Sequence, residues 1–157
     1  MEPDIIDGDL LEQDVEVIVN PWNRNIIPWW LLLPQGVSGS IKKKAGYKPF
    51  KELSKIGPMK LGSAYFTGAG KLPFRGISHV AGINLFWIAS KCSISESVKN
   101  TMKLVEEMEI NSIAFPLIGS GSGNRGKDFS LSIMLATFSK IDSHVRTLIV
   151  KYKRLKK

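Results

Sequence analysis

Two side-chain amides and a run of glycines are the parts of this sequence best suited to binding an anion. Asn20 and Asn23 follow an apolar run at residues 15–19 and are separated by a proline and a tryptophan. The second segment, residues 119–127, reads GSGSGNRGK and joins an apolar run to a helical pattern. Glycines let the backbone approach a ligand with its N–H groups, and a helix N-terminus adds about half a positive charge. The two segments therefore predict a site for an anionic ligand, and a diphosphate suits it.

Two known phosphate-binding motifs nearly match the glycine segment. Gly121, Gly123 and Gly126 satisfy the dinucleotide pattern G-x-G-x-x-G, but a basic segment stands where an acidic residue should end the next strand. The same segment satisfies G-x-x-x-x-G-K, but Asp128 replaces the serine or threonine that would hold magnesium. Neither motif is complete, so only the shared feature, phosphate on backbone amides, is predicted.

Strands and helices that could hold these segments alternate along the chain. Apolar and β-branched runs predict strands at residues 4–6, 15–19, 63–67, 77–81, 112–118 and 147–150. Helical patterns cover residues 40–44, opened by 35–39, then 49–56, a segment with a capping box at 93–96, and a segment capped by Asp128 that runs to about Ile141. The third helix carries an apolar stripe at Ile94, Val98, Met102, Val105 and Met108. This alternation predicts an α/β sandwich with a largely parallel or mixed central sheet.

Length and composition fit one domain over residues 1–157, with residues 151–157 as a basic tail. The acidic N-terminus has no apolar signal segment, and the apolar run at residues 26–34 is too short to span a bilayer. The single cysteine, Cys92, excludes an internal disulfide and favours a cytoplasmic location, and we expect its thiol to be partly buried. One cysteine and two distant histidines give no zinc-ligand spacing. We expect no metal, no cofactor and no membrane contact.

The formal net charge of +8 gathers in the tail and at Lys42, Lys43 and Lys44. Two interpretations stay open. A basic surface attracts polyanions such as nucleic acid, and it equally suits a solvated surface that binds no partner. No nucleic-acid-binding motif with interleaved aromatic residues is visible. The charge alone therefore predicts a preference for anions and nothing narrower.

Five segments, taken in order, resemble the macrodomain family, whose members recognise ADP-ribose. They read GDL at residues 8–10, IVNPWN at 18–23, GVSGSI at 36–41, ISHVAG at 77–82 and IAFPLIGSG at 113–121. Each segment alone is weak, but their order and spacing are specific and span nearly the whole chain. The resemblance implies a three-layer α/β/α sandwich that binds ADP-ribose or an ADP-ribosylated macromolecule.

The resemblance also implies roles for single residues. Asp9 would accept a hydrogen bond from the adenine amino group, with the Leu10 N–H nearby and Tyr152 stacked on the base. Asn23 would hold the hydroxyls of the distal ribose. Two segments would wrap the diphosphate with backbone amides, namely Gly36, Val37 and Ser38 on one side and Ser120, Gly121, Ser122, Gly123 and Asn124 on the other.

One departure from the family pattern bears on catalysis. Hydrolytic macrodomains carry an aspartate after GGG-Val, whereas residues 33–38 here read LPQGVS and place Ser38 at that position. A carboxylate can activate water, but an unassisted serine hydroxyl cannot act as a base near neutral pH. Two functions stay open: hydrolysis of an ADP-ribosyl bond, with Asn23 and Ser38 as catalytic residues that position ligand and water, and binding without catalysis.

Some of these residues have purely structural interpretations as well. Asp9 can cap the turn that follows the first strand. Asn20 is expected to brace loop backbone, and His79 is expected to be a hydrogen-bonded core histidine and not a base. The tryptophans either wall the distal ribose or pack loop onto core, and we expect the second (Trp22, Trp29 and Trp30).

Overall fold

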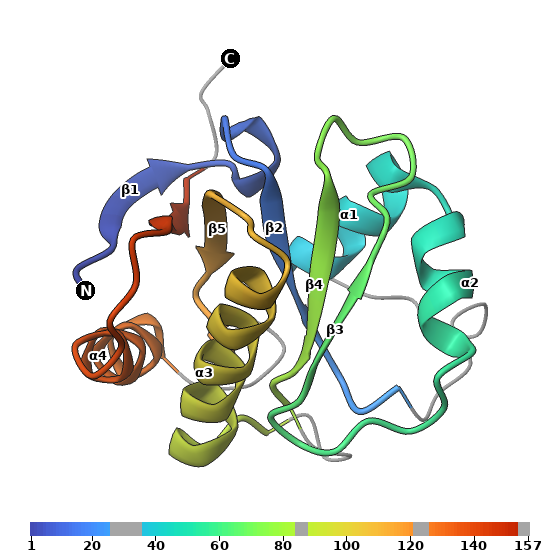
Figure 1. Ribbon diagram of the computed structural model, residues 1–157. Coiled ribbons are helices and arrows are strands. Elements are labelled where there is room, and N and C mark those ends of the chain that lie inside the picture. Colours follow the sequence, from blue (N-terminus) through green and yellow to red (C-terminus); the bar gives the residue numbers. More distant parts are fainter. Residues whose placement is uncertain (26–35, 84–87, 121–125, 154–157) are drawn as a thin grey trace.

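A six-stranded sheet forms the centre of the molecule (Figure 1). The computed structural model describes residues 1–25, 36–83, 88–120 and 126–153. The strands are β1 (Asp4–Gly8), β2 (Val17–Trp22), β3 (Ala64–Thr67), β4 (Gly76–Ala81), β5 (Ser112–Pro116) and β6 (Arg146–Tyr152). They lie in the order β1-β6-β5-β2-β4-β3, and every neighbouring pair is parallel except β3 with β4. The predicted mixed, largely parallel sheet is confirmed.

Helices cover both faces of the sheet, which makes the fold an α/β/α sandwich. They are α1 (Gly36–Ala45), α2 (Lys48–Ser54), α3 (Lys91–Glu107) and α4 (Lys127–Phe138), with a short 3-10 helix η1 (Leu10–Glu12). In Figure 1, α3 lies in front of the sheet and α1 behind it. Buried residues of α3 and α4 form one core cluster with the sheet, and those of α1, α2 and η1 form the other.

Strand β2 shows why the central strands are apolar on both faces. Val17 and Val19 belong to the cluster beneath α3 and α4, whereas Ile18 and Trp22 belong to the cluster beneath α1 and α2. The strand continues through Pro21 to Trp22, beyond the predicted end at residue 19. Pairing with β5 is confined to Val17 and Ile18, so the missing N–H of Pro21 does not interrupt that ladder.

The N-terminal cap of α3 lies one turn earlier than predicted. The Ser90 hydroxyl accepts a hydrogen bond from the Ser93 N–H at 3.0 Å, and the Ser93 hydroxyl accepts one from the Ser90 N–H at 2.8 Å. The capping box is therefore Ser90 with Ser93, and the prediction that placed it at residues 93–96 is wrong. The predicted apolar stripe is confirmed, because Ile94, Val98, Met102 and Val105 are buried and Met108 packs against the same cluster.

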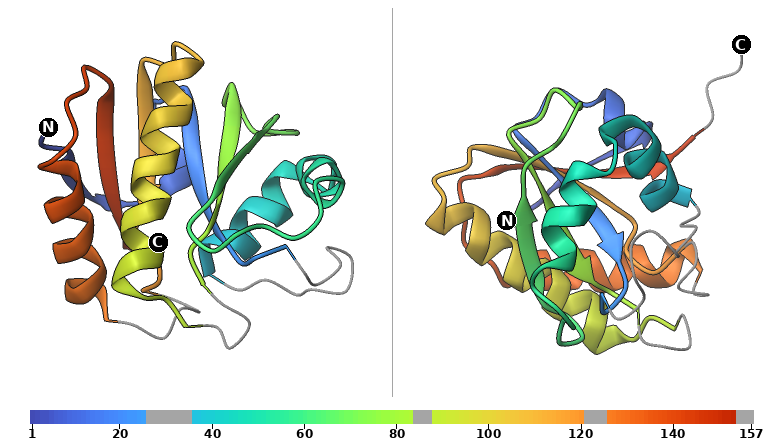
Figure 2. Two further views of the ribbon diagram at one scale, coloured as in Figure 1. Left: turned by 60° about the horizontal axis from the view of Figure 1, so that its bottom comes forward. Right: turned by 90° about the vertical axis from the view of Figure 1, so that its right-hand side faces the viewer.

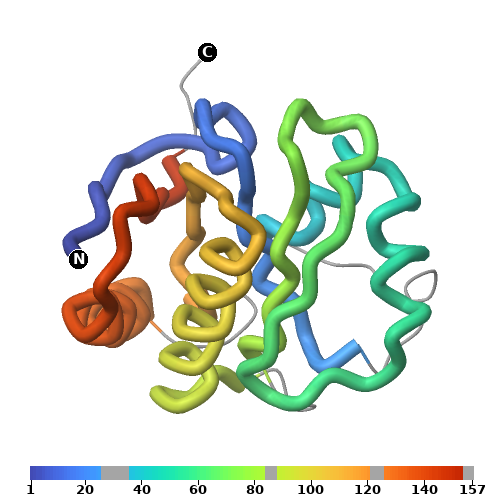
Figure 3. Tube along the Cα trace, viewed as in Figure 1, coloured from blue at the N-terminus to red at the C-terminus, as the bar shows by residue number. Residues whose placement is uncertain are grey.

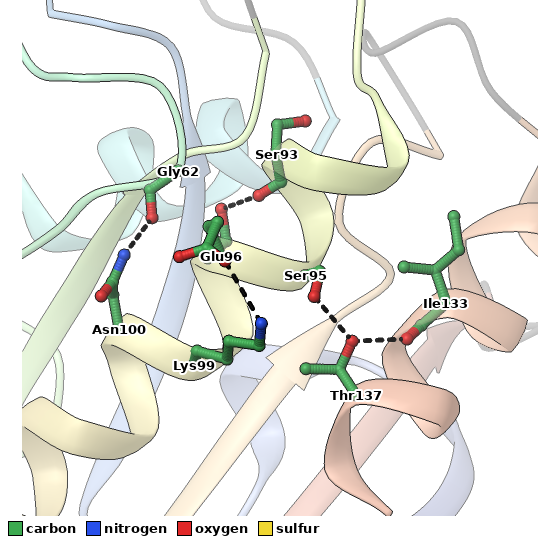
Figure 4. Close-up of polar contacts among 9 residues, drawn as sticks. Gly62, Ser93, Ser95, Glu96, Lys99, Asn100, Ile133 and Thr137 are labelled. Atoms are coloured by element: carbon green, nitrogen blue, oxygen red, sulfur yellow. Dashed lines mark hydrogen bonds and ion pairs between the residues drawn. The ribbon is translucent and has the colours of Figure 1, made fainter. Parts of the chain in front are cut away.

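Polar contacts fix α3 to its neighbours on both sides (Figure 4). Toward α4, the Thr137 hydroxyl contacts the Ser95 hydroxyl at 3.2 Å and donates to the Ile133 carbonyl at 2.8 Å. Toward the start of β3, the Asn100 side chain donates to the Gly62 carbonyl at 2.8 Å. These contacts hold α3 in place, and α3 leads into β5.

Helix α4 begins at Lys127, with Gly126 as its N-cap and no capping hydrogen bond from a side chain. The prediction that Asp128 caps this helix is wrong, although its carboxylate in the first turn still favours the helix dipole. The helix ends at Phe138, not near Ile141. The N-terminal ammonium of Met1 donates to the carbonyls of Phe138 and Ile141, so the start of the chain lies beside the end of α4 (Figure 3).

Two predictions about single side chains have opposite outcomes. Trp22 is buried and packs against the Phe50 ring with centroids 5.2 Å apart, which confirms its place in the core. Trp29 and Trp30 lie outside the described residues. Cys92 is exposed, so the prediction of a partly buried thiol is wrong: the N-cap Ser90 lies three residues before the predicted cap, and Cys92 lies in the first turn of α3. Within the described ranges, no helix is long and apolar enough to cross a membrane.

Candidate functional site

The carboxyl ends of five parallel strands meet at one edge of the sheet, which we call the carboxyl rim. It is formed by the ends of β1, β6, β5, β2 and β4. In Figure 2, left, β6 (red), β5 (orange), β2 (blue) and β4 (green) run side by side. The chain passes from β2 to β4 on one side and returns through α3 to β5 on the other, so the strand order reverses between β2 and β5. Open α/β sheets bind ligands at the carboxyl ends of strands, next to such a reversal.

The structure places Asp9 and Tyr152 at neighbouring strand ends. Gly8 and Tyr152 are partners in the β1–β6 register, and Asp9 follows directly. Asp9 is the N-cap of η1, and its Oδ1 accepts a hydrogen bond from the Leu11 N–H at 2.9 Å. Leu10 is buried, whereas Tyr152 is 59% exposed. The capping role of Asp9 is therefore present in the fold, and Asp9 follows the residue of β1 that pairs with the exposed Tyr152.

Asn23 follows β2 and is held by the turn that it begins. Its Oδ1 accepts a hydrogen bond from the Asn25 N–H at 2.7 Å, and Asn23 is only 8% exposed. Asn25 has a φ of 60° and donates from Nδ2 to the carbonyls of Leu53 and Gly57, both at 2.9 Å. Sequence reasoning missed Asn25, although asparagine two residues after another asparagine is a turn signal. Asn25 ties the Asn23 turn to the end of α2.

Ser38 lies in the first turn of α1, with its hydroxyl directed at β2. The Ser38 Oγ donates to Asn20 Oδ1 at 2.7 Å and lies 3.0 Å from the Pro21 carbonyl oxygen. Val37 packs partly against the apolar cluster on this face. Gly36 opens the helix with a φ of +62°, a conformation that disfavours residues with a Cβ. The predicted segment Gly36 to Ser38 thus lies beside the end of β2.

A tight turn follows β5 at the same rim. The Ser120 N–H and the Ser120 hydroxyl both donate to the Leu117 carbonyl, at 3.3 and 2.9 Å. Gly119 has a φ of +81°, and a Cβ there would lie 2.4 Å from the Ala89 Cβ, so only glycine fits. Of the predicted glycine segment, Gly121, Ser122, Gly123 and Asn124 lie outside the described residues.

Comparison with known proteins identifies the family. The Macro domain profile matches residues 19–134. This chain belongs to the Macro domain family. It is 32% identical over 148 residues to a macro domain-containing protein of Listeria monocytogenes, covering 89% of this chain and 80% of that one.

Two further proteins share part of the sequence or the fold. An uncharacterized protein of Sulfurisphaera tokodaii is 34% identical over 121 residues, which cover 74% of this chain, and the chain spans 63% of that protein's length. A variant of the Oceanobacillus iheyensis macrodomain, solved with ADPR, superposes with a TM-score of 0.80 at 23% identity, covering 94% of this chain and 83% of that one. At this identity the superposition shows the fold alone.

A buried chain of hydrogen bonds links the rim of this macrodomain to the opposite end of the sheet. It runs from Ser38 to Asn20, then from Asn20 Nδ2 to His79 Nδ1 at 2.9 Å and from His79 Nε2 to the Thr67 hydroxyl at 2.8 Å. The Thr67 hydroxyl donates to the Gly68 carbonyl at 2.9 Å. Because the Asn20 amide donates to Nδ1, His79 carries its proton on Nε2.

His79 is neutral in this arrangement. Its side chain is fully buried, and burial lowers its pKa to about 3 from 6.5. The prediction of a hydrogen-bonded core histidine is confirmed. The prediction that Asn20 braces loop backbone is wrong. Among the described residues, its side chain bonds the side chains of His79 and Ser38. No group of three metal-ligating side chains occurs within the part of the chain that the structure describes.

Proposed function

We propose that this chain forms one domain that binds ADP-ribose, free or attached to a larger molecule, along the carboxyl rim. The observation that carries the proposal is the order of groups along that rim. Asp9 and Tyr152 follow β1 and β6, the Leu117–Ser120 turn follows β5, and Asn23 follows β2. Adenine, diphosphate and distal ribose follow one another in ADP-ribose in the same order.

The spacing of the strands supports this assignment. Three inter-strand steps separate β1 from β2, or about 14 Å at about 4.8 Å a step. An extended dinucleotide-like ligand can span this distance, whereas a single phosphate cannot. The structural relative from Oceanobacillus iheyensis was solved with ADPR, which is consistent with the proposal.

Each predicted residue receives a role in this proposal. The Asp9 carboxylate accepts from the adenine amino group, the Leu10 N–H lies nearby, and Tyr152 stacks on the base. The backbone amides of residues 36–38 and 120–124 hold the diphosphate. Asn23 donates from Nδ2 to the distal ribose, while the Asn25 N–H holds its Oδ1.

Titration calorimetry with ADP-ribose and AMP tests the proposal. We expect clear binding of ADP-ribose and much weaker binding of AMP, because AMP lacks the diphosphate and the distal ribose. Asn23→Ala should weaken ADP-ribose binding about tenfold through the loss of one or two hydrogen bonds. Asn111→Ala, an exposed asparagine at the amino end of β5, is the matched control and should bind like the parent chain. If the chain binds neither ADP-ribose nor AMP, the proposal is overturned.

Hydrolysis of an ADP-ribosyl ester is the finer form of this function. In this form, Asn23 positions the ligand and a water near the diphosphate attacks the ester, whose carboxylate is a good leaving group. The Ser38 proton is engaged by Asn20 and Pro21, so Ser38 can orient that water only as an acceptor. Binding without catalysis is the alternative, and the hydroxyl geometry favours it.

Release of ADP-ribose from an ester-linked substrate separates the two forms. If the chain is a hydrolase, Asn23→Ala should lower turnover, and Ser38→Asp should preserve or raise it by supplying the missing carboxylate. Release equal to a control without protein would leave a binding module. Because calorimetry measures affinity independently, this outcome would not affect the binding proposal.

A further inference from the structure

A lysine-rich segment carries almost all of the net charge of this protein. Between residues 42 and 71 there are eight lysines and a single carboxylate, Glu52, whereas the rest of the chain has 14 basic and 13 acidic residues. The segment therefore accounts for seven of the eight net positive charges. Its lysines are Lys42, Lys43, Lys44, Lys48, Lys51, Lys55, Lys60 and Lys71. We call this the lysine surface.

The lysine surface is largely exposed, and it contains a single carboxylate. Seven of its lysines are exposed, and Lys42 is half-buried with its Nζ 5.8 Å from the Phe50 ring centroid. Burial lowers the pKa of Lys42, so the inference rests on the other seven. The ion pairs found between described residues join Arg75 to Glu16 and Lys99 to Glu96, outside this surface. Such a concentration of positive charge attracts polyanions.

A groove of about 530 Å³ opens within this surface. It lies between the α1–α2 junction and the turn after β3, and Tyr47, Lys48 and Lys71 line it together with Glu52. The Lys71 N–H donates to the Ala45 carbonyl at 3.0 Å, which joins the two walls. Its volume is in the range of pockets that hold small ligands, so a nucleotide unit could enter.

The aromatic residues of this surface favour one class of polyanion. The exposed large hydrophobic residues between residues 42 and 71 are Tyr47, at 63%, and Tyr65, at 38%. No aliphatic side chain of that segment stands among them, whereas docking to a membrane surface relies on an apolar face. Lysines combined with an exposed aromatic ring match the way proteins bind single strands, with phosphates on the cations and bases on the ring.

We propose that the lysine surface binds single-stranded nucleic acid, with backbone phosphates at Lys48 and Lys71 and a base stacked on Tyr47. Glu52 repels phosphate and can accept a hydrogen bond from a base amino group, so it orients the strand. The neighbouring lysines along α1 and α2 extend the path of the backbone.

The groove lies at the end of the sheet opposite the carboxyl rim, whereas the end of α2 approaches the Asn23 turn. Ser38, in the first turn of α1, contacts the end of β2, whereas Ala45, at the end of α1, contacts Lys71 beyond β3. Ser38 and Ala45 are seven residues apart in α1, about 10 Å along the helix. Figure 1 shows the turn between β3 and β4 at the top, near the α1–α2 junction. Both ligands should therefore bind at once.

Fluorescence anisotropy of a labelled oligothymidylate with the full chain tests this inference. We expect Lys48→Glu with Lys71→Glu to weaken binding at least tenfold at low salt. The slope of log K against log salt should fall by about 1.4, because two phosphate contacts are lost from a single strand. Tyr47→Ala should also weaken binding, and Tyr47→Phe should restore it. Glutamate at Lys48 suits the start of α2, so folding should be retained.

Lys103→Glu with Lys140→Glu is the matched control, because both residues are exposed, one on α3 and one after α4, and the net charge changes equally. It should change affinity less than twofold, and an equal loss in both double variants would overturn the inference. So would displacement of the oligonucleotide by saturating ADP-ribose, or binding to phosphatidylserine vesicles without binding to the oligonucleotide. None of these outcomes bears on ADP-ribose affinity, which calorimetry measures separately.

Discussion

The two faces of the sheet are built on different principles. The face beneath α3 and α4 is mostly apolar, with Phe115 and Phe138 packed edge to face at 5.2 Å. The face beneath α1 and α2 contains the buried chain that joins Ser38, Asn20 and His79. Apolar packing is not directional, whereas hydrogen bonds fix both distance and angle. The first face therefore stabilises the fold, and the second also positions the start of α1 at the carboxyl rim.

The largest expected effect tests the apolar face. Phe138→Ala should lower the free energy of unfolding by about 3–5 kcal/mol, because it leaves a cavity beside Phe115. Under conditions where the variant is folded, its affinity for ADP-ribose should stay within twofold of the parent. Urea denaturation and calorimetry measure the two quantities. A folded variant that no longer binds would show that this face also shapes the site.

A smaller effect on stability, with a larger effect on binding, is expected on the other face. Asn20→Ala removes the donor to His79 Nδ1 and should cost about 2 kcal/mol of unfolding free energy. It also removes one of the two β2 acceptors of the Ser38 hydroxyl and leaves only the Pro21 carbonyl, so ADP-ribose affinity should fall several-fold. Ser78→Ala is the matched control, because its buried hydroxyl contacts Thr101 of α3 instead. If both variants bind ADP-ribose with equal affinity, the buried hydrogen-bond chain does not position α1.

The smallest expected effect, over the first pH unit below 6.5, is a pH dependence of stability that originates in His79. The unfolded chain binds a proton near pH 6.5, whereas the folded state does so only near pH 3. The stabilisation is therefore complete above pH 6.5 and is lost progressively as the pH falls toward 3. One unit below 6.5 the loss is about 1.4 kcal/mol. Urea denaturation at several pH values measures this slope, which His79→Gln should flatten; an unchanged slope would assign it to other groups.

Much of the architecture could be predicted because the informative residues act locally. The apolar run at residues 15–19 and the stripe from Ile94 to Val105 reflect burial that any buried strand or amphipathic helix imposes. Parallel strands also place their carboxyl ends together. The order of the segments was therefore enough to predict that Asn23, Asp9 and the turn after β5 lie at one rim, without knowledge of any contact.

The failures come from choices between similar partners that only the folded chain decides. Ser90, Ser93 and Ser95 all precede or open α3, and the sequence does not show which pair forms the reciprocal hydrogen bonds. The error also affected Cys92, whose exposure depends on where the helix begins. Asn25 was missed because its partners, the carbonyls at the end of α2, lie 28 and 32 residues away in the sequence.

The pairing of β1 with β6 has a consequence for synthesis of the chain. Asp4 to Gly8 pair with Leu148 to Tyr152, so β1 leaves the ribosome long before its partner strand is made. Contacts of such long sequence separation form slowly. A chain truncated before β6 would lack the strand that positions β1 and the Asp9 that follows it. If Asp9 binds adenine as proposed, such incomplete translation products should bind ADP-ribose poorly.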